Sequence, residues 1–437
     1  MYVMLFDFSF PPSITGAIST MKKILSLALS LTCMSLMAQT KLPAYSPNLT
    51  QKFSFDANGQ FRVMQITDPQ GACPLEEPVK KLLRQGIQKY RPNIIILTGD
   101  NTSSRNKHGE FEKVIAEFMN IFVEEKVPHA ITFGNHDSER KGEEFYTRQE
   151  QYDIYKKMGG EYFVDFDIAE LSGVGSGAIP LYSGDNPVFN LIVMDSGDYA
   201  QSGGYNGCRS DQIQWYEENA GVLPCLWFQH IIICEVNMTN VLVHVPSRAA
   251  DIQILETEDA AEGDADAFFS KPLNKNIKKL PEKAMWSKEL KKYVIPEANM
   301  VWIKQRNCYM IKPAGTVWND DVNSFDKLAE GIGTGELKEK PCPPRWGAYT
   351  DAEHTYEGRT LYQSWLKMGN LKGVYFGHDH MNTFDVTDKN GIRLGFCKAA
   401  TLHSYNDGNP GFRIYDISAD GSYKTEIVTA KQLGIIK

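Results

Sequence analysis

Four strand-like segments of this 437-residue chain each end in a short polar motif, and this repeated arrangement restricts the fold more than any other feature. The segments are rich in β-branched and apolar residues, as buried strands are. The motifs that follow them are Thr67-Asp68-Pro69-Gln70, Thr98-Gly99-Asp100-Asn101, Gly134-Asn135-His136-Asp137 and Gly377-His378-Asp379-His380. Because ligands bind beyond the carboxyl ends of strands in open α/β sheets, we expect the motifs to form one polar site at a sheet edge.

Helices are expected between these strands. Apolar residues recur every three or four positions in residues 78–89 and 110–125, which is typical of amphipathic helices. Further helices are predicted at about 149–157, 210–220 and 360–368, with Ser210 as a candidate N-cap. The alternation of strands and helices indicates βαβ units and a mainly parallel sheet.

More strands are predicted toward the end of the chain. Residues 188–194 and 226–233 are strand-like, and His230 lies inside the second of these segments. Short strands are also expected at 374–376, 392–397, 412–417 and 423–428. We interpret the last three as a meander that closes a second sheet.

The regular pattern is interrupted between residues 236 and about 328. This part contains an acidic, alanine-rich stretch and a lysine-rich stretch. We interpret it as a surface insertion near the site, within one domain of residues 45–437. The alternative is a disordered loop, but Trp286, Trp302, Tyr309 and Trp318 argue for at least partial order.

The N-terminal residues resemble a secretory signal peptide. Met21, Lys22 and Lys23 precede an apolar run, and Ala38 provides a small residue for cleavage. We therefore predict a signal peptide at 21–38, with residues 1–20 upstream of the true start, and a periplasmic or secreted protein. The alternatives are a buried helix or a membrane anchor, but the run is short for a membrane span, and we expect no transmembrane segment in the mature chain.

The composition indicates which partners to expect. The formal net charge is −8, which disfavours a nucleic-acid-binding surface. The strand ends carry carboxylate, amide and imidazole groups but no thiolate, and this donor set favours Zn, Mn or Fe. Two such ions about 3.5–4 Å apart can share a carboxylate, activate a water and promote phosphoryl displacement. The sequence does not indicate an oligomeric state.

Together, the motifs resemble those of the calcineurin-like metallophosphoesterase family. The family pattern is Asp-x-His, Gly-Asp, Gly-Asn-His-Asp/Glu, an isolated His and Gly-His-x-His, and the resemblance covers roughly residues 61–428 apart from the insertion. It implies an α/β fold with a β-sandwich of two mixed sheets flanked by helices. It also implies two divalent or trivalent metal ions and hydrolysis of phosphorylated small molecules.

The resemblance implies a role for each motif residue. Asp68 and His380 would bind the first metal ion, with Gln70 beside them. Asp100 would bridge both ions. The second ion would be bound by Asn135, His230 and His378.

Two further residues would take part in the chemistry. While a metal-bridging hydroxide attacks phosphorus, His136 would protonate the leaving oxygen or stabilise charge. Asp137 would orient the His136 imidazole.

The chain departs from the family pattern at Gln70, where the family usually has histidine. An amide oxygen is a weaker donor than imidazole to a borderline cation, so the first metal should be bound less tightly. The Asp-Pro-Gln form resembles one branch of the family. Purple acid phosphatases, which are related in fold, have a tyrosine ligand where this chain has Ser103, so an iron–tyrosinate site is not expected.

Two alternatives to a phosphomonoesterase remain. One is a non-catalytic protein that binds a metal or a phosphorylated ligand, which Gln70 motivates. The other is a phosphodiesterase that acts on nucleotides or lipid headgroups, because monoesterases and diesterases share these motifs. We expect the insertion and the loop at 196–208 to select the substrate.

Several polar residues lack motif support. Asp195 is expected to cap a turn. The histidines expected to be structural or exposed are His108, His129, His244 and His354. His403 could reach the mouth of the site, and Asp379 is expected to lie behind the ligands.

Overall fold

The computed structural model describes residues 42–139, 146–200, 205–233, 351–378, 380, 385–387, 390–402, 404 and 408–436, and short strands within 255–311. The predicted signal peptide and most of the predicted insertion lie outside these residues. In the part of the chain described here, no helix is both long enough and apolar enough to cross a bilayer.

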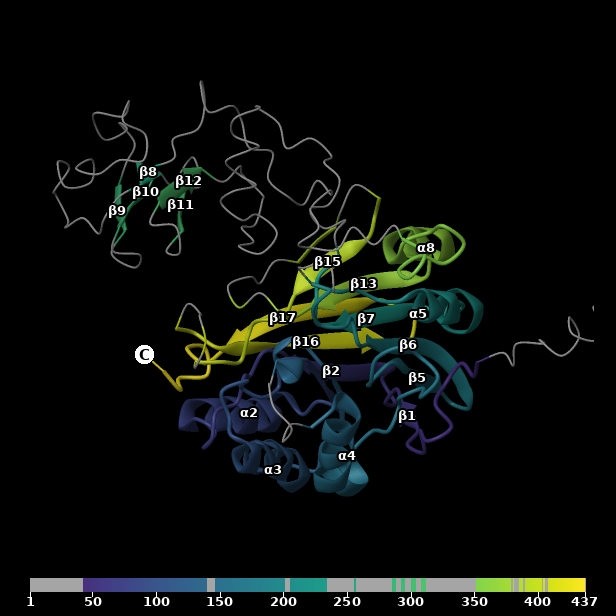
Figure 1. The fold of residues 1–437 in the computed structure, drawn as a ribbon, viewed down its shortest axis with the longest axis horizontal. Coiled ribbons are helices and arrows are strands. Elements are labelled where there is room, and N and C mark those ends of the chain that lie inside the picture. Colours follow the sequence, from purple (N-terminus) through teal and green to yellow (C-terminus); the bar gives the residue numbers. More distant parts are fainter. Residues whose placement is uncertain are drawn as a thin grey trace, which may run out of the picture. The chain divides into compact units, whose positions relative to one another are not determined.

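Two mixed β-sheets form the unit that extends from Pro43 to Lys437 (Figure 1). An apolar cluster joins them, since Val63 and Ile96 of one sheet belong to the same buried core as Phe228 and Tyr375 of the other. This is the predicted α/β sandwich of two mixed sheets with helices outside.

The first sheet has five strands in the order β17-β16-β2-β3-β4. Strands β2, β3 and β4 are parallel, whereas β16 pairs antiparallel with both β2 and β17. The run of Ile94, Ile95, Ile96 and Leu97 is fully buried, as expected for a central parallel strand. The bounds are β2 (Gln60–Ile66), β3 (Ile94–Thr98), β4 (His129–Thr132), β16 (Gly411–Ser418) and β17 (Tyr423–Thr429).

The second sheet has seven strands in the order β1-β5-β6-β7-β13-β15-β14. Its central strands β6, β7, β13 and β15 are parallel to one another, whereas β5 pairs antiparallel with β6 and β14 pairs antiparallel with β15. The bounds are β1 (Phe53–Ser54), β5 (Gly177–Ser183), β6 (Asn186–Met194), β7 (Cys225–Gln229), β13 (Leu371–Phe376), β14 (Asp385–Thr387) and β15 (Arg393–Phe396).

Helices cover the outer face of each sheet. The five-stranded sheet shares a core with α2 (Glu77–Tyr90), α3 (His108–Glu124) and α4 (Arg148–Gly159), through residues such as Leu82 and Phe118. Trp227 of the seven-stranded sheet packs against Tyr216 and Trp365. Tyr216 directly follows α5 (Ser210–Trp215), and Trp365 lies within α8 (Leu361–Met368).

The remaining elements are short. The sandwich also contains two 3₁₀ turns, η1 (His136–Ser138) and η2 (Gly160–Tyr162), and one π-helical turn, η3 (Tyr216–Ala220). Within 255–311 lie the antiparallel strands β8 (Leu255–Glu256), β9 (Met285–Ser287), β10 (Lys292–Val294), β11 (Met300–Ile303) and β12 (Cys308–Ile311).

The predicted C-terminal meander is wrong. Strand β15 pairs parallel with β13 in the seven-stranded sheet, whereas β16 and β17 form a hairpin in the other sheet. Short connections usually join neighbouring strands, but here residues 397–400 cross between the sheets. Cys397 donates its backbone N–H to Phe376, and Ala400 donates to Thr67.

Two local boundaries also differ from the prediction. Strand β7 ends at Gln229, so His230 follows the strand instead of lying inside it. Arg209 is the N-cap of α5, and Ser210 is its first helical residue; the backbone N–H of Arg209 donates to Oε1 of Gln212 at 2.7 Å.

Candidate metal centre

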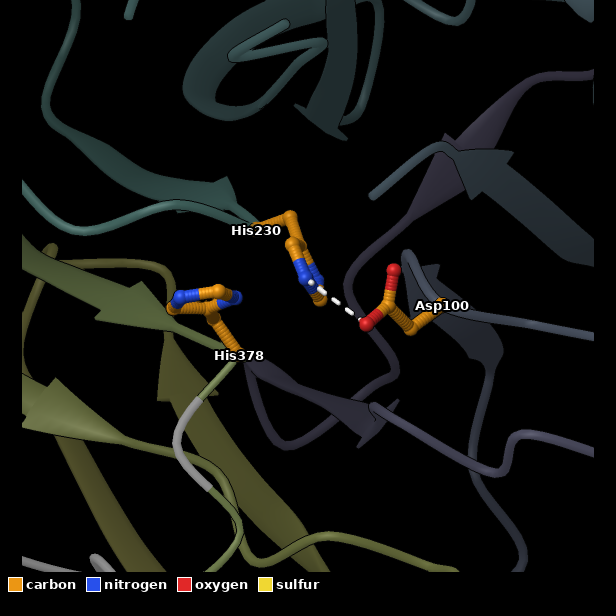
Figure 2. Close-up of side chains that lie close together, drawn as sticks. All are labelled: Asp100, His230 and His378. Carbon is orange, nitrogen blue, oxygen red and sulfur yellow. Dashed lines mark ion pairs between the residues drawn. The ribbon is translucent and has the colours of Figure 1, made fainter. Parts of the chain in front are cut away.

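Five strands bring their carboxyl-terminal residues to one site, as the sequence predicted. Asp68 follows β2, Asp100 follows β3 and Asn135 follows β4 in one sheet, while His230 and His378 follow β7 and β13 in the other. Figure 2 shows the side chains of Asp100, His230 and His378 converging from both sheets. The site therefore spans the edge where the two sheets meet.

The candidate ligands form two groups that share one carboxylate. Asp100, His230 and His378 offer ligand atoms that all lie within 4.8 Å of one another, and so do Asp68, Asp100 and His380. The Nε2 atom of His230 lies 3.3 Å from Oδ2 of Asp100, and His380 Nε2 lies 3.3 Å from Oδ1 of Asp68. Asp100 is therefore the residue that belongs to both groups of candidate ligands.

The backbone at the site is held in an uncommon conformation. Asp68, Gln70, Asp100 and His378 have φ values of 48°, 40°, 50° and 75°. Each such residue costs on the order of 1–3 kcal/mol unless the surrounding structure supports it. Here the backbone N–H of Asp68 bonds to Gly99, and the backbone N–H of Gln70 bonds to Asp100. Strain concentrated at these positions is typical of a functional site.

Close backbone approach explains the glycines of the motifs. A Cβ atom at Gly134 would lie 2.3 Å from Oδ1 of Asp100, and one at Gly377 would lie 2.0 Å from Oγ1 of Thr67. A larger residue would therefore displace the Asp100 carboxylate at position 134 and the Thr67 hydroxyl at position 377.

Three buried polar atoms at the site suit metal ligation. Asp68 Oδ1, Asn135 Oδ1 and His230 Nε2 make no hydrogen bond within the described residues, although the first and third lie in ion-pair range of each other, 3.9 Å apart. Buried polar atoms normally have a hydrogen-bond partner, because desolvation is costly. Cations bound to these atoms would satisfy them, so the residues present fit the metal ions that the donor set implies.

Neighbouring groups fix the orientation of these side chains. Nδ1 of His230 lies 2.8 Å from the carbonyl oxygen of Thr98, which leaves Nε2 facing the carboxylates. The backbone N–H of His378 donates to Oδ2 of Asp68 at 2.8 Å, so Oδ1 is the atom that faces His230 and His380.

The charges at the site are strongly coupled. Burial opposes the charged form of Asp100, but His230 and the neighbouring histidines outweigh it and lower the pKa of Asp100. Burial likewise opposes protonation of His230, yet Asp100 and Asp68 raise the pKa of His230 to about 9. Burial and the adjacent charge of His230 lower the pKa of His378 to about 3. The site thus holds two anionic carboxylates that attract positive charge.

Gln70 lies in the same group as the candidate ligands. Its Nε2 atom is 3.4 Å from Oδ2 of Asp100 and 3.4 Å from Nε2 of His380. Rotation of the amide by half a turn would present the oxygen at the same point, since the two orientations have the same shape.

His136 and Asp137 occupy different environments. The backbone N–H of His136 donates to Oδ1 of Asp100 at 2.8 Å, and His136 Nε2 lies 3.8 Å from Oδ2 of the same residue. The buried carboxylate of Asp137 accepts the backbone N–H groups of Gly134, at 2.9 Å, and Asn101, at 3.1 Å. Asp137 therefore braces the turn.

The carboxylate hydrogen-bonded to the His136 ring belongs to Glu139, which the sequence analysis missed. The signal was present, because residues three apart on a 3₁₀ turn lie on the same side. Tyr199 was missed as an individual residue. It reaches the site from the loop at 196–208, and Asn135 Nδ2 donates to its hydroxyl at 2.8 Å.

The same loop carries a second tyrosine to the site. The rings of Tyr199 and Tyr205 stack with centroids 5.5 Å apart. The ring of Tyr205 lies edge-on to that of His378, with centroids 4.3 Å apart. The loop expected to select the substrate thus contacts candidate ligands.

The other polar residues have structural partners. Asp195 pairs with Arg148 and accepts the backbone N–H groups of Val174 and Gly197, in agreement with a turn role. His129 is buried against Phe122 and Phe163, and His354 contacts Asp351 and Asn206. The predictions for Asp379, His244, His403 and the side chain of His108 fall outside the described residues.

The sandwich and its paired carboxylate–imidazole groups resemble those of metallophosphoesterases. Comparison with family models agrees, because residues 61–250 match the calcineurin-like phosphoesterase family. The resemblance inferred from the motifs is therefore confirmed over this range, which includes His230 but ends before His378 and His380.

Curated relatives are distant and longer than the matched region. The chain is 24% identical over 257 residues to "Probable inactive purple acid phosphatase 29" of Arabidopsis thaliana, covering 48% of this chain and 63% of that protein. It is 22% identical over 193 residues to "Phosphatase DCR2" of Saccharomyces cerevisiae, covering 38% of this chain and 33% of that protein. The match thus spans less than two thirds of each relative.

Solved structures give weak matches. A Thermus thermophilus protein aligns with a TM-score of 0.34 and 9% identity, covering 84% of this chain and 98% of that chain.

Proposed function

We propose that this chain hydrolyses phosphate esters with two metal ions bound at this site. The observation that carries the proposal is the position of Asp100, whose carboxylate belongs to both groups of candidate ligands. A shared carboxylate suits a pair of cations that act on one phosphoryl group.

Each candidate ligand has a place in this proposal. Asp68, Gln70 and His380 would hold one ion, Asn135, His230 and His378 the other, and Asp100 both. When bound, Mn, Zn or Fe would neutralise charge on the phosphoryl oxygens and make water available as a nucleophile at neutral pH.

His136 would serve the leaving group. About a third of its side chain is exposed, while its backbone N–H is anchored on Asp100. A partly exposed imidazole beside the bridging carboxylate is suited to give a proton to the departing oxygen or to stabilise its charge.

A non-catalytic binding protein is the second candidate. It is favoured by Gln70, and the relative from Arabidopsis thaliana carries the word "inactive" in its name. Such a protein would keep the metals and bind a phosphorylated ligand without turnover.

The test is a screen for phosphate release across monoesters and diesters, with Mn, Zn or Fe added and bound metal measured on the same sample. Turnover by the wild type that is lost in Asp100→Asn, with the fold retained, would support the proposal. Tight binding of a phosphorylated ligand without turnover would favour the binding protein, and turnover of diesters alone would identify a phosphodiesterase.

We also propose that the protein acts in the periplasm or outside the cell, on the basis of the signal-like residues 21–38. The mass of the exported chain would test this, since cleavage after Ala38 removes the residues before it. An uncleaved chain that stays in the cytoplasm would contradict the proposal.

A further inference from the structure

We propose that Glu139 is a positioning residue, which holds the His136 imidazole and the Tyr199 hydroxyl in one arrangement beside Asp100. This inference rests on the proposed function for its catalytic consequence, although the arrangement itself can be tested without turnover.

The two oxygens of Glu139 serve two different donors. Oε2 contacts Nδ1 of His136, and Oε1 accepts the hydroxyl hydrogen of Tyr199. An ionised carboxylate only accepts hydrogen bonds, so Nδ1 must carry the hydrogen in this contact. Nε2 of His136 is then the ring nitrogen that faces the site, 3.8 Å from Oδ2 of Asp100.

The arrangement continues through Tyr199 to a candidate ligand. Nδ2 of Asn135 donates to the Tyr199 oxygen at 2.8 Å. This bond fixes which end of the Asn135 amide faces away from the metals, and it leaves Oδ1 as the buried atom available to a cation. Asn135 thus donates to Tyr199, and both Tyr199 and His136 donate to Glu139. Each of these three hydrogen bonds has its own donor and a single acceptor atom.

Exposure makes such positioning necessary. The side chains of His136 and Glu139 are 34% and 25% exposed, and Tyr199 is 43% exposed. Core packing does not restrain partly exposed side chains of this kind, so their directions depend on specific contacts. The stacking of Tyr199 on Tyr205 supplies a further contact, because Tyr205 itself lies against His378.

The first test is nitrogen-15 NMR of the histidine rings in the metal-free full chain. The His136 signals are assigned by their loss in His136→Gln. We expect hydrogen on Nδ1 in the wild type and a changed tautomer or an averaged signal in Glu139→Ala. The exposed residue Glu170 provides the control, and Glu170→Ala should leave the spectrum unchanged. An unchanged His136 signal in Glu139→Ala would overturn the proposal.

The second test uses the metal-loaded protein and an alkyl phosphate monoester. Loss of a residue that orients a functional group typically costs about 10–100-fold in activity, so we expect kcat to fall by that factor in Glu139→Ala with KM and metal content little changed. Glu139→Gln keeps the side-chain shape and one of the two acceptor oxygens. Its kcat should therefore fall less than that of Glu139→Ala. In a His136→Gln background, Glu139→Ala should cause no further loss, because Glu139 acts through His136.

The outcomes separate this inference from the proposed function. If the wild type releases no phosphate, the proposed function fails, and the NMR experiment still decides the arrangement. If the wild type is active and Glu139→Ala keeps its kcat, the positioning role fails while the proposed function stands.

Discussion

The hydroxyl of Thr67 donates a hydrogen bond to Oδ2 of Asp68, with a distance of 2.7 Å between the two oxygens. Both side chains are fully buried, so this bond helps to decide which carboxylate oxygen faces the histidines. We expect Thr67→Val to weaken metal binding by about 10–100-fold, because it removes a partner that orients a ligand and keeps the side-chain shape. Isothermal titration of the metal-free protein with Zn or Mn would measure this.

Thr132 provides a matched control for Thr67. It is also fully buried, and its hydroxyl makes no hydrogen bond within the described residues. Thr132→Val removes an unsatisfied polar group, so stability should be unchanged or slightly higher and metal affinity should be unchanged. Equal affinities for Thr67→Val and the wild type would show that Thr67 does not orient Asp68.

The metal ion beside Gln70 should be bound less tightly than the other. An amide is a weaker donor than imidazole, and Gln70 lies beside Asp100 and His380, where it would serve only one ion. Gentle chelation followed by metal analysis should remove one equivalent before the second. Gln70→His should reduce the difference in metal affinity between the two sites. Simultaneous loss of both equivalents from the wild type would count against unequal sites.

The sequence predicted those parts of the fold that depend on local patterns. Strand β3 and the motif after it were evident because a run of buried β-branched residues ends in Gly99 and Asp100. The course of residues 397–400 from one sheet to the other was not predictable in this way. It depends on hydrogen bonds to Phe376 and Thr67, which are distant in the sequence.

The candidate site was predictable to a similar extent. Short motifs placed Asp68, Asp100 and His378 together because parallel strands end at the same edge. Tyr199 was not identified, because it meets Glu139 across a separation of 60 residues. The expected partner of His136 was the adjacent Asp137, but adjacent residues on a turn point in different directions, and Asp137 instead binds backbone N–H groups.

His136→Asn should separate catalysis from metal binding. The ring lies beside Asp100 but is not one of the groups that converge on it as candidate ligands. We expect both metals to remain and kcat to fall by about 10²–10⁴-fold, the usual contribution of general acid catalysis. The loss should be smaller for nitrophenyl esters, whose leaving groups depart without a proton. Loss of a metal ion in this variant would instead make His136 a ligand.

The pH dependence of stability should contain a contribution from His129. Its ring is fully buried, and burial lowers its pKa from 6.5 to about 4, although Nδ1 lies 3.1 Å from the carbonyl oxygen of Val127. The unfolded chain therefore takes up a proton near pH 6.5, whereas the folded protein resists protonation until about pH 4. His129 thus contributes stability above pH 6.5 that is lost as the pH falls toward 4, by roughly 2–4 kcal/mol in total. Urea unfolding of the wild type and His129→Leu between pH 4.5 and 7.5 would measure it. The variant should lose less stability on acidification, and parallel pH curves for the two proteins would contradict this assignment.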